Sequence, residues 1–274
     1  MIYPLTKWRF LMTLPSAGDW NMAVDEAILE AVGRGDVLPT LRLYAWVPPC
    51  LSLGYAQPFA DVDRYRLAER GWGLVRRPTG GRAILHTDEL TYAVIGPYSD
   101  PRLSGSVLES YQRLSAALLK ALSLLDIPAQ VNEVVTNERN AKGPVCFEVP
   151  SNYEITVNGK KLIGSAQARR KEGVLQHGSL PLYGNLTRII KVLVYSNEAK
   201  RADAESRLRV HATTAAEILG QPLTWDTAAK AFKAAFTEVL NLELSTGDLT
   251  PSERSRAAEL DTEKYANPKW TERV

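Results

Sequence analysis

A cysteine and a lysine near the middle of the chain have the chemistry of a nucleophile and its activating cation. Lys161 follows Cys146 by fifteen residues. A thiol attacks a carbonyl carbon as its thiolate, and a neighbouring ammonium group lowers the thiol pKa and so favours that form. The alternative is that Cys146, one of two cysteines in the chain, is a small buried apolar residue, as solitary cysteines often are. The residue types alone leave both interpretations open.

A predicted hairpin sets the orientation of the lysine. Asn158-Gly159 is a strong signal for a two-residue turn between two strands. In that register Thr156 lies opposite Lys161, and the alternation of side chains along a strand places Lys161 on the same face as Glu154. Lys161 is therefore expected on the more polar face of the hairpin, where a cleft could lie. A fully solvated hairpin end is the alternative, since most lysines are exposed.

The segment 76–86 combines glycines with cations. Its candidate substrate-binding residues are Arg76, Arg77, Gly80, Gly81, Arg82 and His86. Glycines let a ligand approach the backbone, and free amides with arginines suit an anionic group or a developing oxyanion. The segment matches neither the phosphate-binding loop nor the dinucleotide fingerprint, and an ordinary turn with a structural histidine is the alternative. Three histidines and two cysteines spread along the chain give no metal-ligand spacing, so we expect no metal site.

Helices and strands mix along the chain without strict alternation, which favours an α+β fold of mixed sheets flanked by helices. Apolar periodicity predicts a first helix capped at Asp19 and a long helix begun by a capping box at Ser106 and Glu109. Strands are expected at 40–46, 51–55, 73–77 and 89–95, and a helix capped by Asp61 should end near Gly71. Thr250 with Pro251 is expected to begin the last helix.

The length and composition of the chain suit a single globular domain. The 274 residues are 45% hydrophobic and 23% charged, so we expect residues 1–274 to form a single domain with a mainly helical C-terminal section from about residue 186. A net charge of +2 gives no reason to expect a nucleic-acid partner. The N-terminus lacks the apolar core of a signal peptide and no apolar run approaches membrane-spanning length, so we expect a cytoplasmic protein that does not bind membranes.

Several motifs together resemble the lipoate-protein ligase and octanoyltransferase superfamily, which is related to the biotin ligases. They are the Arg-Arg-x-x-Gly-Gly loop that ends at His86, the Asn-Gly-Lys-Lys-Leu-Ile-Gly-Ser-Ala-Gln hairpin at 158–167, and Gln176-His177-Gly178-Ser179. The resemblance runs from about Trp8 to about Leu182 and is strongest to the protein octanoyltransferases known from Gram-positive bacteria. It implies the biotin/lipoyl protein ligase catalytic-domain fold, which is similar to that of class II aminoacyl-tRNA synthetases.

The resemblance also implies roles for individual positions. Cys146 stands where this branch carries its acyl-thioester cysteine, and Lys161 stands at the active-site lysine of the superfamily. The other matched positions would contact the substrate: Gly80, Gly81, Arg82 and His86 in the loop around the acyl group, Ser165, Ala166 and Gln167 on the strand beside it, and His177 and Gly178 beyond. Arg82 replaces the third glycine of the nucleotide-using ligases and would crowd an adenylate, which favours thioester chemistry without ATP or another cofactor.

The reaction that this resemblance implies is a two-step acyl transfer. Cys146 takes an octanoyl group from octanoyl-acyl carrier protein, and a lysine of a lipoyl domain, in the glycine cleavage H protein or an E2 subunit, then attacks the acyl-enzyme. Lys161, His86 or a water would accept the proton of the attacking amine. The alternatives are an ATP-dependent lipoate or octanoate ligase, an amidotransferase from H protein to dehydrogenase E2 subunits, and a non-catalytic carrier-binding relative.

Three further expectations concern the surroundings of the site. The acyl chain needs an apolar channel. The strand residues expected to line it are Leu74, Val75, Ile84 and Tyr92. Arg169, Arg170 and Lys171 form a basic cluster that is either a solvated turn or a contact for an acidic carrier or lipoyl domain. Cys50, at the head of a predicted strand, is expected to be buried.

Overall fold

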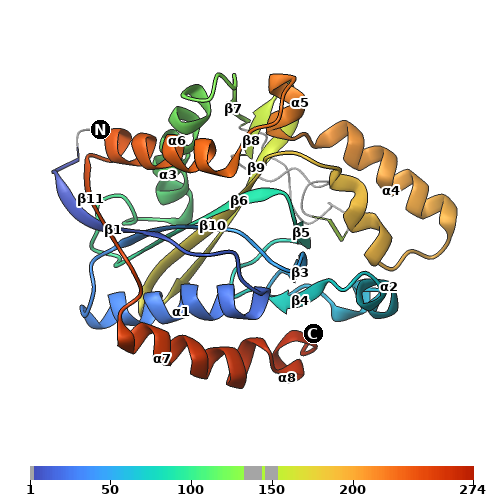
Figure 1. Cartoon of the computed structure of the whole chain (residues 1–274), viewed down its shortest axis with the longest axis horizontal. Coiled ribbons are helices and arrows are strands. Elements are labelled where there is room, and N and C mark those ends of the chain that lie inside the picture. The colour runs from blue at the N-terminus through green and yellow to red at the C-terminus, as the bar shows by residue number, and fades with distance from the viewer. Residues whose placement is uncertain (1–2, 133–143, 146–153) are drawn as a thin grey trace.

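An eight-stranded mixed sheet forms the centre of the computed structural model, which describes residues 3–132, 144–145 and 154–274 (Figure 1). Its strand order is β11-β1-β2-β6-β10-β9-β8-β7. The strands span Thr6–Met12 (β1), Thr40–Tyr44 (β2), Glu89–Gly96 (β6), Gln130–Asn132 (β7), Glu154–Val157 (β8), Lys160–Arg170 (β9), Gly173–Pro181 (β10) and Leu242–Gly247 (β11). Strand β1 is parallel to β2 and β11, whereas the other neighbours are antiparallel. The mixed sheet predicted from the sequence is therefore confirmed.

A second, three-stranded sheet carries the glycine-containing loop. Strand β3 (Cys50–Leu53) lies between β4 (Gly73–Arg76), to which it is parallel, and β5 (Ile84–His86), to which it is antiparallel. The segment 77–83 connects the two outer strands. Cys50 is 1% exposed, as predicted, and burial raises the pKa of its thiol.

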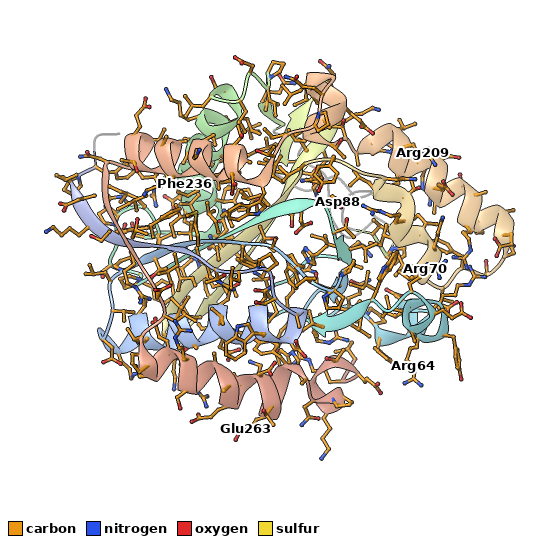
Figure 2. The ribbon with its side chains drawn as sticks, viewed as in Figure 1. Arg64, Arg70, Asp88, Arg209, Phe236 and Glu263 are labelled. Carbon is orange, nitrogen blue, oxygen red and sulfur yellow. The ribbon has the colours of Figure 1, made fainter. Side chains whose placement is uncertain are left out.

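Helices cover both faces of the large sheet (Figure 1). Helix α1 (Gly18–Arg34) packs with α7 (Pro251–Leu260) on one face, and α3 (Val107–Ser123) packs with α6 (Trp225–Val239) on the other. Each pair contributes its apolar side chains to a separate core cluster against the sheet. Phe236 of α6 is an example from the cluster that α3 and α6 form. Its side chain points toward the sheet (Figure 2), and its ring centroid lies 6.1 Å from that of Tyr92 on β6.

Local capping explains where the helices begin. The capping boxes predicted at Ser106 with Glu109 and at Thr250 with Glu253 are both present. The cap predicted at Asp61 is wrong, because Asp61 ends a short 3-10 helix over Phe59–Asp61 and Asp63 accepts from the backbone of α2 (Arg64–Glu69). Asp19 is likewise inside the first turn of α1 rather than at its N-cap. Where several acidic residues lie near the start of a helix, the sequence pattern does not show which of them occupies the N-cap.

The register predicted for the hairpin is confirmed. Thr156 lies opposite Lys161 and Val157 opposite Lys160 across β8 and β9. Strand β9 then continues as the outer partner of β10, which pairs with β6 in the middle of the sheet. Lys161 is therefore held on a rigid strand that crosses the molecule.

The chain after residue 185 is mainly helical. It contains α4 (Glu198–His211), α5 (Ala215–Leu219), α6, α7 and α8 (Pro268–Thr271), with a 3-10 helix over Leu186–Val192 and a π-helical turn over Asp261–Tyr265. Strand β11 returns to the large sheet beside β1. The C-terminal end then runs along α1 toward the small sheet (Figure 1). No helix among the described residues is long and apolar enough to cross a membrane.

Candidate active site

A cavity of about 930 Å³ lies between the two sheets. Strands β3, β5, β9 and β10 line it, together with the segment 55–58, the glycine-containing loop and the start of α3. The predicted site residues that line it are Arg77, Gly80, Gly81, Arg82, His86, Lys161, Ser165, Ala166, Gln167, His177 and Gly178. Its volume falls in the range of small-molecule sites. Segments distant in the sequence thus meet around one space.

Lys161 reaches this cavity as one half of a buried ion pair. Its Nζ atom donates to Glu154 Oε1 at 2.5 Å, and the two side chains are 5% and 9% exposed. The predicted shared face of Lys161 and Glu154 is therefore confirmed, and the solvated alternative is excluded. A buried ammonium group needs such a partner, because the desolvation of an unpaired charge is costly.

Cys146 lies outside the described residues. Val145, which precedes it in the chain, is 1% exposed and forms an isolated parallel bridge with Ala83. The backbone NH of Ala83 donates to the carbonyl of Pro144 at 3.1 Å. The described residues just before Cys146 are thus fixed beside the glycine-containing loop.

Arg77 shapes that loop from inside. Its guanidinium donates to the carbonyl oxygens of Gly80 at 2.9 Å and Arg82 at 2.7 Å, and to the Ser52 hydroxyl at 3.0 Å. Gly81 has a φ of 91°, which L side chains rarely adopt. Gly54 packs so closely that a Cβ there would lie 1.8 Å from the Gly81 carbonyl oxygen. The loop conformation is therefore set by two glycines and one arginine.

Arg76 does not line the cavity. It is fully buried and donates to the carbonyl oxygens of Gly54 at 2.8 Å, Gln57 at 2.6 Å and Thr271 at 2.7 Å. In return, the indole of Trp270 donates to the Arg76 carbonyl at 2.8 Å. Arg76 therefore links the cavity wall at 54–57 to the C-terminal helix. It was predicted to contact the substrate, but its side chain instead holds these two segments in position.

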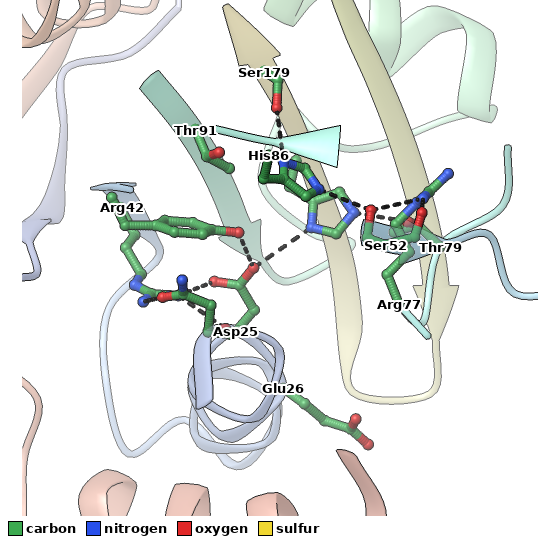
Figure 3. Close-up of polar contacts among 12 residues, drawn as sticks. Asp25, Glu26, Arg42, Ser52, Arg77, Thr79, His86, Thr91 and Ser179 are labelled. Atoms are coloured by element: carbon green, nitrogen blue, oxygen red, sulfur yellow. Dashed lines mark hydrogen bonds and ion pairs between the residues drawn. The ribbon is translucent and has the colours of Figure 1, made fainter. Parts of the chain in front are cut away.

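His86 is held in a buried network at the cavity wall (Figure 3). Its Nε2 atom lies 2.8 Å from the Ser52 hydroxyl. Its Nδ1 atom lies 2.6 Å from Glu89 Oε1, and its ring stacks on that of Trp46 with the centroids 3.9 Å apart. A proton on Nδ1 satisfies both contacts, because Nδ1–H donates to the carboxylate while Nε2 accepts from the hydroxyl. Burial alone would raise the pKa of Glu89, but His86 and the Thr91 and Ser179 hydroxyls hold it below its ordinary value.

His177 belongs to a parallel network (Figure 3). Its Nε2 atom lies 2.7 Å from the Thr79 hydroxyl, and its Nδ1 atom lies 3.5 Å from Asp25 Oδ2. Burial lowers the pKa of His177, although Asp25 opposes the shift. Burial alone would raise the pKa of Asp25, but Arg42 and His177 bring it below its ordinary value. His177 is therefore a buried imidazole oriented by a carboxylate on α1, and burial disfavours its protonated form.

Strands β9 and β10 present polar groups beside these networks. The Ser165 hydroxyl lies 2.7 Å from the Tyr92 hydroxyl, and Gln167 donates to Gln176 Oε1 at 2.9 Å. Ala166 is paired with His177, and Gly178 with Ser165, across the strands. Residues 165–167 of β9 and residues 177–178 of β10 thus lie side by side at the cavity.

The apolar lining differs from the one expected. Of the four predicted channel residues, Ile84 lines the cavity, whereas Leu74, Val75 and Tyr92 pack in core clusters. The apolar residues that do line it include Met22, Trp46, Val107 and Leu108. Strand alternation identified apolar residues but could not show on which side of each strand the cavity lies.

The basic cluster at the end of β9 divides into three environments. Arg169 donates to the carbonyl oxygens of Leu103 and Gly105 at 2.9 and 2.8 Å. Arg170 is exposed and lines the cavity. The Lys171 side chain is 92% exposed and lies 3.7 Å from Glu172. The solvated-turn interpretation therefore fails for Arg169, whereas Arg170 and Lys171 are both exposed.

Sequence reasoning missed the buried acids that orient the two histidines. Asp25 and Arg42 are fully buried and form an ion pair of 2.7 Å, and Tyr44 also donates to Asp25. Two features of the sequence could have indicated this pair: Asp25 lies within the apolar stripe of the first helix, and Arg42 lies inside an alternating strand. Charged residues at such positions need partners when they are buried. Their pairing across the fold could not be read from spacing. Among the described residues, no group of three or more metal-binding side chains lies together.

Comparisons with known proteins show what the whole chain is similar to. Residues 18–237 match the lipoyl protein ligase A/B catalytic domain. The chain is 40% identical to octanoyltransferase LipM of Kyrpidia tusciae over 97% of its length and 98% of the relative. It is 41% identical to octanoyltransferase LipM of Moorella thermoacetica over 98% and 99% of the two chains, and 37% identical to that of Staphylococcus aureus over 96% and 97%.

Solved structures show the same fold. A bi-partite lipoate protein ligase from Thermoplasma acidophilum superposes with a TM-score of 0.83 at 24% identity, covering 97% of this chain and 96% of that chain. A lipoate-protein ligase A bound with ATP gives a TM-score of 0.80 at 24% identity, covering 97% and 99%. The expected ligase-type catalytic fold is therefore confirmed.

Proposed function

Because the chain belongs to the lipoyl protein ligase A/B catalytic domain family, we propose that it transfers an octanoyl group from an acyl carrier protein to a lysine of a lipoyl domain. The observation that carries this proposal is the 37–41% identity to octanoyltransferases over nearly the whole chain. We also propose that residues 1–274 form one catalytic domain. The pairing of β11, from the C-terminal part of the chain, with β1, from the N-terminal part, supports this proposal.

The first step forms an acyl-enzyme. The Cys146 thiolate attacks the thioester carbonyl, a new carbon–sulfur bond forms, and the carrier sulfur leaves as a thiolate that takes up a proton. Lys161, at the cavity wall, would favour the thiolate of Cys146 through its positive charge. Two observations support this pairing. Lys161 lines the cavity, and Val145, which precedes Cys146, bridges to Ala83 at the end of the glycine-containing loop, whose residues 80–82 line the same cavity.

The second step releases the acyl group to the acceptor. The lysine amine attacks the acyl carbon, an amide bond forms, and the Cys146 sulfur leaves while the amine proton passes to a base. His86 and His177 present an Nε2 atom to a hydroxyl in each network, which suits them to orient groups around the acyl chain. Because the acyl group is already activated as a thioester, the reaction needs no ATP.

A reconstituted transfer assay tests the proposal. Octanoyl-acyl carrier protein and a lipoyl domain are incubated with the enzyme with and without ATP, and the lipoyl domain is analysed by mass spectrometry. We expect octanoylation without ATP, and a loss of about 10²-fold or more in rate for Lys161→Gln. Modification that requires free octanoate and ATP would establish a ligase instead, and transfer from octanoyl-H protein alone would establish an amidotransferase.

A further inference from the structure

Four side chains from distant segments form one cluster at the cavity. Tyr55 follows β3, Arg170 ends β9, and Trp270 and Arg273 belong to the C-terminal end. The two rings meet edge to face with centroids 6.0 Å apart, and the Arg273 guanidinium lies 3.9 Å from each ring centroid. Arg170 lies 5.2 Å from the Tyr55 ring. We call these four residues the arginine–aromatic platform.

The two cations of the platform are not neutralised by protein carboxylates. In the part of the chain that the structure describes, Arg170 and Arg273 form no ion pair. Arg170 donates to the carbonyl oxygen of Pro78 at 3.2 Å and Arg273 to that of Tyr55 at 2.9 Å, and both also interact with the Tyr55 side chain. Lys264 differs, because it touches the Trp270 ring but also pairs with Glu26 at 2.6 Å. A guanidinium has five N–H donors, so both arginines keep donors for an anion.

Stacking on aromatic faces fixes these guanidinium groups without cancelling their charge. The pKa of Tyr55 lies below its ordinary value, first because of a hydrogen bond from Arg273 to its side chain and then because of the positive charges of Arg273 and Arg170. Both arginines are exposed. The platform is thus a preformed, accessible site for a negatively charged group.

The platform is also far from Lys161 along the same cavity. Tyr55, Arg170 and Lys161 all line it. Arg170 follows Lys161 by nine residue steps along β9, so their Cα atoms are at most about 30 Å apart along an extended strand. A group bound at the platform must therefore reach the reacting centre through a long arm. A carrier protein holds its acyl thioester at the end of such an arm, joined to the protein by a phosphodiester.

We propose that the arginine–aromatic platform docks the acyl donor, with Arg170 and Arg273 binding the phosphodiester and acidic surface of the carrier protein. This inference rests on the proposed octanoyl transfer. Planar guanidinium groups bind phosphate through paired hydrogen bonds, and cations around a cavity mouth accelerate the approach of an acidic partner. The acceptor is less suited to this site, because its lysine side chain is short and is attached without a phosphodiester, so the acceptor must bind close to the reacting centre.

The test compares two donors in the first half-reaction. Octanoyl-carrier protein has the phosphodiester and the acidic surface, whereas octanoyl-pantetheine has the same thioester arm and neither of them. Acylation of the enzyme is measured by mass spectrometry for the wild type, for Arg170→Ala/Arg273→Ala, and for the control Lys230→Ala. Lys230 is an exposed cation on α6, away from the C-terminal end (Figure 1). A thermal melt checks that each variant is folded.

We expect the ratio of kcat/KM for octanoyl-carrier protein over octanoyl-pantetheine to fall about tenfold or more in the double variant, mainly through KM, and the loss to shrink as salt is raised. Lys230→Ala should keep the wild-type ratio. An unchanged ratio, or equal losses with both donors, would overturn the platform proposal. So would a loss confined to transfer from acyl-enzyme to lipoyl domain, because the platform would then dock the acceptor. Failure of the wild type to be acylated by either donor would instead contradict the proposed function.

Discussion

Replacing Asp25 by asparagine tests whether the buried acid on α1 organises one wall of the active site. Asp25 accepts hydrogen bonds from Arg42 at 2.7 Å and from Tyr44 at 2.9 Å, and it faces His177 Nδ1 at 3.5 Å (Figure 3). Both members of the Asp25–Arg42 pair have side chains with 0% exposure. Asparagine has nearly the same shape, so the change removes the charge and leaves the space filled.

The expected loss of stability is large because Arg42 remains buried without its counter-ion. Breaking a buried ion pair on one side costs about 3–5 kcal/mol. Asparagine still accepts one hydrogen bond, so we expect Asp25→Asn to lower the free energy of unfolding by about 3 kcal/mol. The pKa of Asp25 is lowered in the folded protein. Its stabilising contribution is therefore complete above its ordinary pKa and decreases as the pH falls below about 4.

The protein itself offers a matched control. Asp36 and Arg34 form an ion pair of the same length, 2.7 Å, but their side chains are 51% and 52% exposed. Asp36→Asn should cost about 0–1 kcal/mol, since exposed pairs contribute little. Urea unfolding followed by tryptophan fluorescence at pH 7 and pH 4 measures both variants. Equal effects of the two substitutions at pH 7 would refute the reasoning.

Three other predictions follow from single positions. Gly54→Ala should lower the free energy of unfolding by about 2 kcal/mol or more, because its Cβ meets the Gly81 carbonyl oxygen, whereas Gly80→Ala, which meets nothing within 4 Å, should change it by about 0.5 kcal/mol or less in the same denaturation assay. Cys50 should stay unmodified by iodoacetamide in the native protein at pH 8, because burial raises its thiol pKa; peptide mass spectrometry that finds it labelled before denaturation would contradict its placement. Arg76→Lys should lower the melting midpoint by several °C, since lysine cannot replace the fork of contacts from Arg76 to Gly54, Gln57 and Thr271, and an unchanged melt would show that these contacts are dispensable.

Local sequence motifs predicted which helices and strands form better than they predicted the residues at which these elements begin and end. The Asn158-Gly159 turn fixed the hairpin register, because a two-residue loop allows only one pairing of its flanking strands. Capping boxes located the starts of α3 and α7 because the two reciprocal hydrogen bonds are purely local. The choice between Asp61 and Asp63 depended on the contacts of neighbouring segments, which no local pattern contains.

The candidate site was predictable where one motif supplied several neighbouring positions. The glycine-containing loop and the β9–β10 hairpin each placed a run of predicted residues at the cavity. The prediction that Arg76 binds the substrate failed because its side chain points toward the C-terminal helix, 195 residues away in the sequence. The platform at Tyr55 and Arg273 depends on the same long-range contact between the cavity wall and the C-terminal end. Such contacts arise only once the whole chain has folded.

Intact-protein mass spectrometry of the enzyme after incubation with octanoyl-acyl carrier protein in the absence of ATP tests whether this protein works through an acyl-enzyme. We expect the wild type to gain the mass of one octanoyl group, to lose it on treatment with hydroxylamine, and to pass it to a lipoyl domain, while Cys146→Ala gains nothing. A wild type that stays unmodified, or a Cys146→Ala variant that still carries and transfers the acyl group, would contradict a mechanism in which Cys146 forms the thioester.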